Sequence, residues 1–198
     1  MLDLTISIVS YNTKDLLRRC LASIFKHTTK ITFQVIVVDN VSGDGSAAMV
    51  KKDFPQVKLI KNRANRWYTG ANNQALRQAQ GRYFLILNSD IFLTTNALKT
   101  MVNYLDRHPQ VGALEPLQLY EDSRMALTGS HHNTPLTDFF ELTWLGRKLA
   151  NQKLLRRFRL ARKNRRHTWP AEVICDAALM TKLSLVKQIG GYDEKLKL

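Results

Sequence analysis

Apolar residues in the first 115 positions follow two alternating spacings, and this alternation predicts strands separated by helices. Continuous or every-second apolar runs, typical of strands buried in a sheet, occupy 4–10, 33–38, 57–60 and 83–87. Apolar stripes with helical spacing occupy 16–25, 71–79 and 97–105. Strands that alternate with helices form βαβ units, so we predict an α/β fold with a doubly wound, mainly parallel sheet flanked by helices.

Polar side chains follow three of these strands at the point where each strand ends. The clusters are Ser10-Tyr11-Asn12, Asp39-Asn40 and Asn88-Ser89-Asp90. Because the carboxyl ends of parallel strands meet at one edge of a sheet, we expect the clusters to converge there. Asp39 can accept a hydrogen bond from a base imide or a ribose hydroxyl, and Tyr11 can stack on or border a base. Asp90 can hold a cation that neutralises a diphosphate, so the sequence predicts a nucleotide pocket.

Two interpretations of the cluster at Asp90 stay open on the pattern alone. Asn-Ser-Asp is ordinary turn composition, and the same residues offer oxygen ligands to a divalent cation. The first strand is not followed by Gly-x-Gly-x-x-Gly or by a P-loop, which argues against a dinucleotide-binding fold and against a P-loop enzyme.

Length and composition narrow the class of protein. A chain of 198 residues is long enough for one domain with a sizeable core, and its 44% hydrophobic content is that of a globular protein. No apolar run reaches the roughly 18 residues of a membrane span, and no basic segment precedes the first apolar residues, so we expect no signal peptide. Two distant cysteines fit a reduced, cytoplasmic setting.

Positive charge is concentrated in one stretch. The formal net charge is +14, and ten lysine and arginine residues lie between Arg147 and Arg166, where no acid occurs. Between Leu149 and Arg166 the pattern predicts a basic amphipathic helix, which either contacts an anionic membrane surface or packs on the domain with a solvated basic face. A nucleic-acid-binding protein is the alternative that the charge suggests, but few aromatics are interleaved and no nucleic-acid motif is present.

Five segments together resemble the family 2 glycosyltransferases, and in particular their bacterial rhamnosyltransferase-like branch. They are Ile8 to Asn12, Val37 to Asn40, Leu87 to Asp90, Ala177 to Met180, and Val186 to Glu194. The resemblance covers about residues 4–115 and 172–194. It implies the GT-A fold, a UDP- or dTDP-sugar donor bound through Mn²⁺ or Mg²⁺, and transfer with inversion. It also implies a glycan or lipid-linked acceptor in cell-surface polysaccharide synthesis, at the inner face of the plasma membrane.

The resemblance assigns roles to individual residues. The nucleotide would be bound by Ser10, Tyr11, Asn12, Asp39, Asn73 and Asn88. Asp90 would hold the cation, which makes the metal interpretation the favoured one, and Asp176 could touch the donor sugar. We therefore predict a single domain with a nucleotide-binding half at 1–115, an unmatched basic insertion at 116–170 and the start of an acceptor-binding part at 171–198. A nucleotidyltransferase would instead show a Gly-rich basic signature after the first strand, which is absent.

Two departures from the family pattern raise further expectations. Trp67 stands where a glycine is expected, and we expect its ring to pack on the sheet rather than alter the rim of the pocket, because tryptophan is mostly buried. The family's catalytic base is an aspartate in a Glu-Asp pair downstream of Gly-Gly-Tyr-Asp-Glu, and the sequence ends at Leu198 before such a pair. We expect a C-terminally truncated chain that catalyses poorly, in which Asp193 and Glu194 are only weak candidates for the base.

Overall fold

The predicted strands pair side by side in the computed structural model, which describes residues 2–126, 128, 143 and 168–197. The parallel strands are β1 (Leu2–Ser10), β2 (Phe33–Asp39), β3 (Lys58–Lys61) and β4 (Gly81–Leu87). Two further strands, β5 (Ala113–Leu114) and β6 (Ala178–Lys182), complete one sheet in the order β3-β2-β1-β4-β6-β5. Strand β6 is antiparallel to both of its neighbours. The prediction of a mainly parallel α/β sheet is confirmed.

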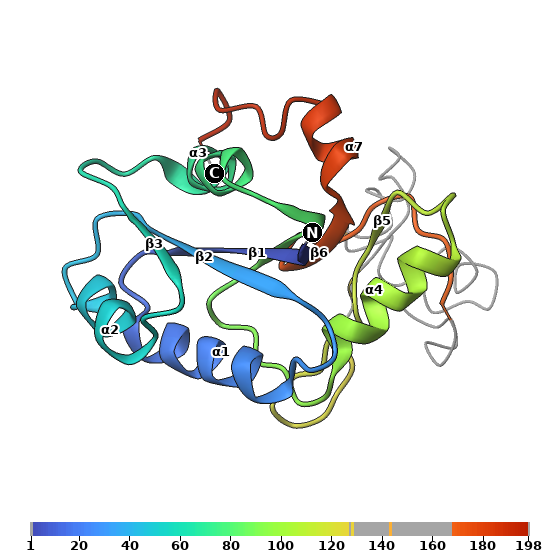
Figure 1. Cartoon of the computed structure of the whole chain (residues 1–198), viewed down its shortest axis with the longest axis horizontal. Coiled ribbons are helices and arrows are strands. Elements are labelled where there is room, and N and C mark those ends of the chain that lie inside the picture. Colours follow the sequence, from blue (N-terminus) through green and yellow to red (C-terminus); the bar gives the residue numbers. More distant parts are fainter. Residues whose placement is uncertain (1, 127, 129–142, 144–167, 198) are drawn as a thin grey trace. The chain divides into compact units, whose positions relative to one another are not determined.

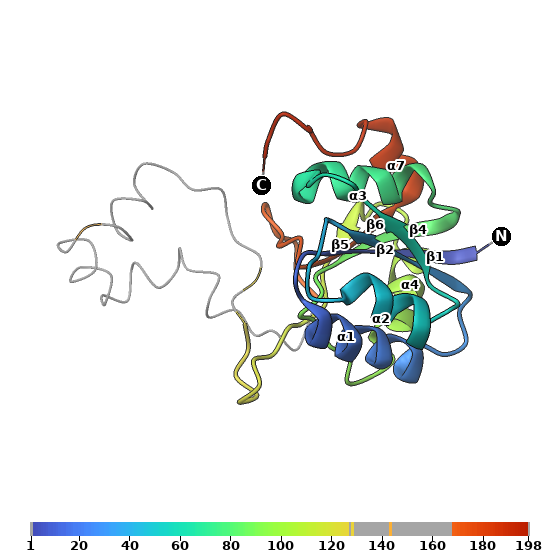
Figure 2. The ribbon, with the colours of Figure 1, turned by 90° about the vertical axis from the view of Figure 1, so that its left-hand side faces the viewer.

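Helices cover both faces of this sheet (Figure 1). One face carries α1 (Lys14–His27), α2 (Ser46–Asp53) and α4 (Ala97–Arg107), and the other carries α3 (Trp67–Arg77) and α7 (Leu183–Gln188). The view turned by 90° shows the same two layers of helices above and below the strands (Figure 2). Right-handed crossovers from β1 to β2 and β3 place α1 and α2 on one face, and the crossover in the opposite direction, from β3 back to β4, places α3 on the other.

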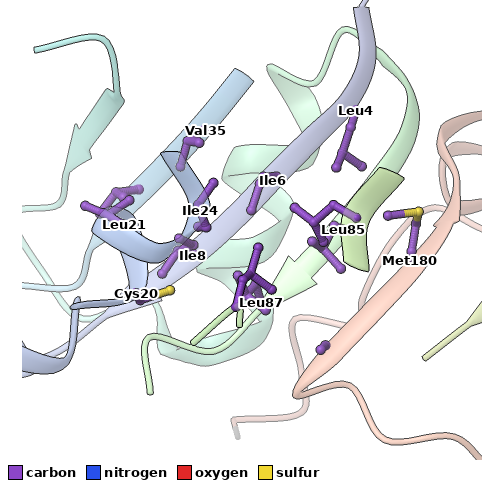
Figure 3. Close-up of a cluster of buried hydrophobic side chains, with 14 of the residues drawn as sticks. Leu4, Ile6, Ile8, Cys20, Leu21, Ile24, Val35, Leu85, Leu87 and Met180 are labelled. Carbon is purple, nitrogen blue, oxygen red and sulfur yellow. The ribbon is translucent and has the colours of Figure 1, made fainter. Parts of the chain in front are cut away.

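The alternation of side chains along each strand gives the sheet two hydrophobic cores. Leu4, Ile6 and Ile8 of β1 pack with Leu21 and Ile24 of α1 (Figure 3). The opposite core is formed by Ile36, Val38, Phe84 and Ile86 of β2 and β4, packed against Ala71 and Ala75 of α3. Because consecutive strand residues face opposite sides, the nearly unbroken apolar runs in the sequence serve both cores.

The face of β1 beneath α3 is polar, although it is fully buried. The hydroxyl of Ser7 donates to Asn72 Oδ1 at 2.8 Å, and Thr5 Oγ1 accepts the backbone N–H of Gly81 at 2.9 Å. Each buried hydroxyl therefore has a partner, which removes the cost of taking it out of water. These bonds attach α3 and the start of β4 to the central strand.

The strand order creates a crevice at the carboxyl ends of β1 and β4. The chain proceeds from β1 to β2 and β3 on one side of β1, whereas β4 pairs on its other side. The connections that leave these strands diverge at this point, which is where open α/β sheets bind ligands.

The chain divides into two compact units. One unit is Met1–Pro116 with Asp176–Leu198, which contains the sheet, and the other is Leu117–Cys175. Within the second unit, Leu119 and Met125 form an isolated antiparallel bridge, and the Arg124 guanidinium lies 5.7 Å from the centre of the Tyr120 ring. The predicted basic helix between Leu149 and Arg166 lies outside the described residues. Among the helices that are described, none is long and apolar enough to cross a membrane.

Candidate functional site

A cavity of about 460 Å³ opens at the carboxyl ends of β1 and β4. Its walls come from the ends of three neighbouring strands and from the start of α3. The lining residues are Val9, Tyr11, Thr13, Leu16, Asn40, Asn65, Trp67, Tyr68, Asn88, Ser89 and Asp90. Of the residues that the sequence predicts for the site, the structure brings Tyr11, Asn88 and Asp90 together around this cavity.

The loop after β1 is fastened to the loop after β2. Asn12, whose φ of +55° lies in the left-handed region, accepts the backbone N–H of Gly43 on Oδ1 at 2.8 Å, and its own N–H donates to Ser42 Oγ at 3.0 Å. Asn12 therefore uses its carboxamide to hold the two loops together. Its neighbour Tyr11 is 55% exposed and lines the cavity, while Ser10 is buried behind it with Oγ 3.1 Å from Thr13 Oγ1.

Asp39 ends β2 as a fully buried carboxylate with one oxygen unused. Its Oδ2 accepts the backbone N–H of Ser42 at 3.2 Å, whereas Oδ1 has no partner among the described residues. A buried carboxylate oxygen without a partner costs free energy, which a hydrogen bond donated by a ligand would recover. Asp39 does not line the cavity itself, but it directly precedes Asn40, which does.

Asn40 shapes the loop that leads into α3. Its Oδ1 accepts the Arg66 backbone N–H at 3.1 Å, and its Nδ2 donates to the Trp67 carbonyl at 3.1 Å. The loop is thereby held so that Trp67 lines the cavity, 46% exposed. The expectation that Trp67 packs on the sheet is wrong, because these bonds place its backbone at the rim. The sequence pattern assigned no individual role to Asn40. Its position directly after Asp39, at the end of a predicted strand, was the available signal.

Asp90 lies on the turn that follows β4 and faces the cavity. The turn closes with the Ile91 N–H donating to the Asn88 carbonyl at 3.2 Å, and the Asn88 N–H donates to Ala177 at the start of β6 at 2.8 Å. The Cys20 Sγ atom is 3.8 Å from the same Asn88 carbonyl. Burial raises the pKa of this thiol to about 12, and the negative charge of Asp90 raises it further. Cys20 is thus a protonated core residue.

The donor set at this turn fits a cation that is shared with a ligand. Asp90 is exposed in the cavity wall, and the described residues contain no group of three or more His, Cys, Asp or Glu side chains that could hold a metal ion by themselves. Mg²⁺ and similar hard cations are commonly held by one or two carboxylates plus substrate phosphates. Asp90 could therefore hold Mn²⁺ or Mg²⁺ together with a diphosphate, with Asn88 and Ser89 beside it.

Two tyrosines connect the Asn88 turn to the start of β6. The Tyr68 hydroxyl lies 3.3 Å from both Asn88 Oδ1 and the Asp176 carbonyl, and the Tyr192 hydroxyl donates to Asp176 Oδ2 at 3.2 Å. The two rings meet edge to face, 6.0 Å apart. Burial is the main cause that raises the pKa of both phenols, so both remain protonated donors. Asp176, predicted to touch the donor sugar, does not line the cavity in this arrangement.

Asn73 lies away from the cavity and holds the C-terminal segment instead. Its Oδ1 accepts the Tyr192 N–H at 2.9 Å, and its Nδ2 donates to the Tyr192 carbonyl at 2.9 Å and to Glu194 Oε1 at 3.0 Å. The Asn73 hydrogen bond and Arg77, 3.5 Å away, hold the pKa of Glu194 below its usual range. Asp193 is exposed, and its Oδ1 accepts the Lys195 N–H. Neither weak candidate for the base lines the cavity.

Comparison with known proteins relates this geometry to one family. The family model described as Glycosyl transferase family 2 matches residues 5–187. The succinoglycan biosynthesis protein ExoO of Rhizobium meliloti is 32% identical over 105 residues, covering 52% of this chain and 30% of ExoO. The N-acetylglucosaminyl-diphospho-decaprenol L-rhamnosyltransferase of Mycobacterium tuberculosis is 24% identical over 212 residues, covering 97% of this chain and 65% of that protein. The chain thus spans less than two thirds of the length of these relatives.

Solved structures share the fold. TarS 1-349 of S. aureus in complex with UDP-GlcNAc superposes with a TM-score of 0.62 at 17% identity, covering 95% of this chain and 47% of TarS 1-349. The mannosyltransferase PcManGT of Pyrobaculum calidifontis, in complex with GDP-Man and Mn²⁺, gives a TM-score of 0.62 at 20% identity, covering 98% of this chain and 50% of PcManGT. The GT-A fold that the sequence predicts is confirmed by these superpositions.

Proposed function

Because the chain belongs to glycosyl transferase family 2, we propose that it carries the donor site of an inverting glycosyltransferase. The donor is a nucleotide-diphosphate sugar of the UDP or dTDP class, bound with Mn²⁺ or Mg²⁺. The observation that carries this proposal is the cavity at the ends of β1 and β4, with the Asp90 carboxylate in its wall, together with the unpartnered oxygen of Asp39, which directly precedes the wall residue Asn40. Asp39 would bind the nucleoside end of a nucleoside diphosphate, and Asp90 would bind its diphosphate end through the cation.

Each carboxylate has its own task in this proposal. Asp39 is buried and acceptor-only, so it selects a group that donates a hydrogen bond, such as a base imide or a ribose hydroxyl. Asp90 is exposed in the cavity wall, so it holds the cation against the diphosphate. When bound, that cation neutralises the charge that develops on the departing diphosphate. The Tyr68 hydroxyl lies 3.3 Å from Asn88 Oδ1, and this contact helps to hold the turn that carries Asp90 in place.

The transfer that we propose is a single displacement. The oxygen of an acceptor hydroxyl forms a bond to the anomeric carbon of the sugar, the bond from that carbon to the diphosphate oxygen breaks, and a base takes the hydroxyl proton. Glu194 is unsuited to be that base in the described arrangement, because Asn73 and Arg77 engage its carboxylate and lower its pKa. Asp193 and Glu194 instead suit a role in orienting the acceptor, and Asp176 lies near enough to the Asn88 turn to border the donor sugar.

The acceptor that we propose is a glycan or a lipid-linked saccharide of the cell surface. The names of the relatives support this class, since ExoO belongs to succinoglycan biosynthesis and the M. tuberculosis protein is named for a diphospho-decaprenol acceptor. The ten basic residues between Arg147 and Arg166 would then bring the site to the anionic inner face of the plasma membrane, at about 1 kcal/mol for each residue near the headgroups. Co-sedimentation with anionic vesicles at low and high salt tests this contact, and absence of binding at low salt would remove it.

Calorimetric titration with UDP and dTDP, with and without Mn²⁺, tests the donor site. We expect Asp90→Asn to abolish the dependence of binding on the cation, and Asp39→Asn to weaken binding about tenfold even without metal, since a hydrogen bond to a charged group is lost. Asp53→Asn, at the far end of α2 and absent from the cavity wall, is the matched control and should bind as the wild type does. If neither nucleotide binds the wild-type chain in the presence of metal, the proposal fails.

A further inference from the structure

Trp67 has a backbone conformation that its side chain disfavours. Its φ is +58°, in the left-handed region where a bulky residue is a genuine outlier. Hydrogen bonds on both sides hold it there: its N–H donates to Asn65 Oδ1 at 2.8 Å, and its carbonyl accepts from Asn40 Nδ2 at 3.1 Å. A glycine would fit this conformation without strain, so the presence of an indole calls for a reason other than folding.

The position of Trp67 relates it to one end of the cavity. Asn40, which holds the Trp67 carbonyl, directly follows Asp39 at the end of β2, whereas Asp90 follows β4 on the other side of β1. Trp67 is therefore tied through its backbone to the loop after β2, the strand that ends at Asp39 with its unpartnered oxygen. Tyr11, the other half-exposed aromatic residue in the wall, extends from the strand between β2 and β4.

We propose that Trp67 is a stacking platform for the nucleobase of the donor and thereby contributes to donor selection. This inference rests on the proposed nucleotide site and adds a residue to it. The face of an indole is large and rigid, and it stacks on any planar base, at a strength that corresponds to about a fivefold to hundredfold gain in affinity. The strain at Trp67 and its half-exposed ring are then explained together, because the bound base covers the ring and its binding energy offsets the conformational cost.

Two variants of Trp67 and two ligands separate this role from its alternatives. Trp67→Gly removes the ring and relieves the left-handed strain, while Trp67→Phe keeps an aromatic face. UDP contains the base, and pyrophosphate contains only the part that the cation would bind. With Mn²⁺ present, we expect Trp67→Gly to weaken UDP binding at least fivefold, to leave pyrophosphate binding within twofold of the wild type, and to leave the thermal midpoint equal or higher. Trp67→Phe should retain most of the UDP affinity.

Tryptophan fluorescence gives an independent measurement. UDP should quench the wild-type emission, and the quenching should disappear in Trp67→Phe but persist in Trp169→Phe, because the proposal assigns the stacking to Trp67 alone. Unchanged UDP affinity in Trp67→Gly would overturn the stacking role while leaving the nucleotide site intact. An equal loss of pyrophosphate affinity, or a lower thermal midpoint, would instead make Trp67 a support for the loop. If the wild type binds no nucleotide, both this inference and the proposed function fall.

Discussion

Replacing Asn73 by alanine is expected to release the C-terminal segment from α3 without disturbing nucleotide binding. The Asn73 side chain is 6% exposed and makes three hydrogen bonds to the segment, two with the Tyr192 backbone and one with Glu194. At about 0.5–1.5 kcal/mol for each bond, the substitution should lower the local stability of the docked segment by about 2–4 kcal/mol. Since every 1.4 kcal/mol is tenfold, exchange of the Tyr192 amide should accelerate on the order of 30- to 1,000-fold.

Hydrogen exchange measured by mass spectrometry over residues 190–196, combined with UDP titration, is the appropriate assay. Arg77→Gln is the matched control on the same helix, since it removes only an ion pair between two exposed side chains, 3.5 Å apart, of the kind that contributes about 0–1 kcal/mol. Asn73→Asp should resemble the alanine variant, because a carboxylate can still accept the Tyr192 N–H but would repel the Tyr192 carbonyl and Glu194. Slow exchange in Asn73→Ala together with weakened UDP binding would refute this reasoning and return Asn73 to the nucleotide site.

Three further predictions concern the fold. Gly81→Ala should lower the urea midpoint by an amount equivalent to about 1–3 kcal/mol or more, because a Cβ there would lie 2.5 Å from the β1 backbone. Iodoacetamide at pH 8 should label Cys175 well before Cys20, whose pKa of about 12 leaves almost no thiolate, and denaturant should abolish the difference. The hydrogen bond from Arg82 lowers the pKa of Asp106 below 3.8, so its stabilisation is present above pH 3.8 and lost as pH falls through the lowered pKa. Thermal melts of Arg82→Gln should depend less on pH below 3.8.

Periodicity was sufficient for the parallel half of the sheet. The predicted runs at 4–10 and 33–38 became Leu2–Ser10 and Phe33–Asp39, because strands buried on both faces leave little doubt about their apolar residues. The antiparallel half was not predicted. Strand β6 has five residues, and its position depends on pairing with β4, which lies far away in the sequence. Such pairings leave no local signal in so short a strand.

The candidate site was predictable where strand ends alone determine it. Tyr11 and Asp90 line the cavity because they lie within three residues of the ends of β1 and β4. An asparagine that binds a ligand and one that binds a distant backbone segment look the same in a sequence. Only the long-range hydrogen bond with Tyr192 shows that Asn73 holds the C-terminal segment. Tryptophan is usually buried, but the hydrogen bonds of Asn40 hold the loop so that Trp67 is 46% exposed. The geometry of this loop cannot be predicted from amino-acid composition.

The discontinuity of the unit that contains the sheet has an evolutionary consequence. Strands β5 and β6 pair directly, yet the roughly 60 residues between them form the second unit, so the whole of that unit occupies the place of a hairpin loop. Closing a loop of this length rather than one of four residues costs only about 2–3 kcal/mol, because the entropy of closure grows with the logarithm of length. Segments of different length and charge can therefore be exchanged between Leu114 and Ala178 while the pairing of β5 and β6 stays the same. Insertions and deletions between these two points are therefore tolerated more readily than insertions within the strands.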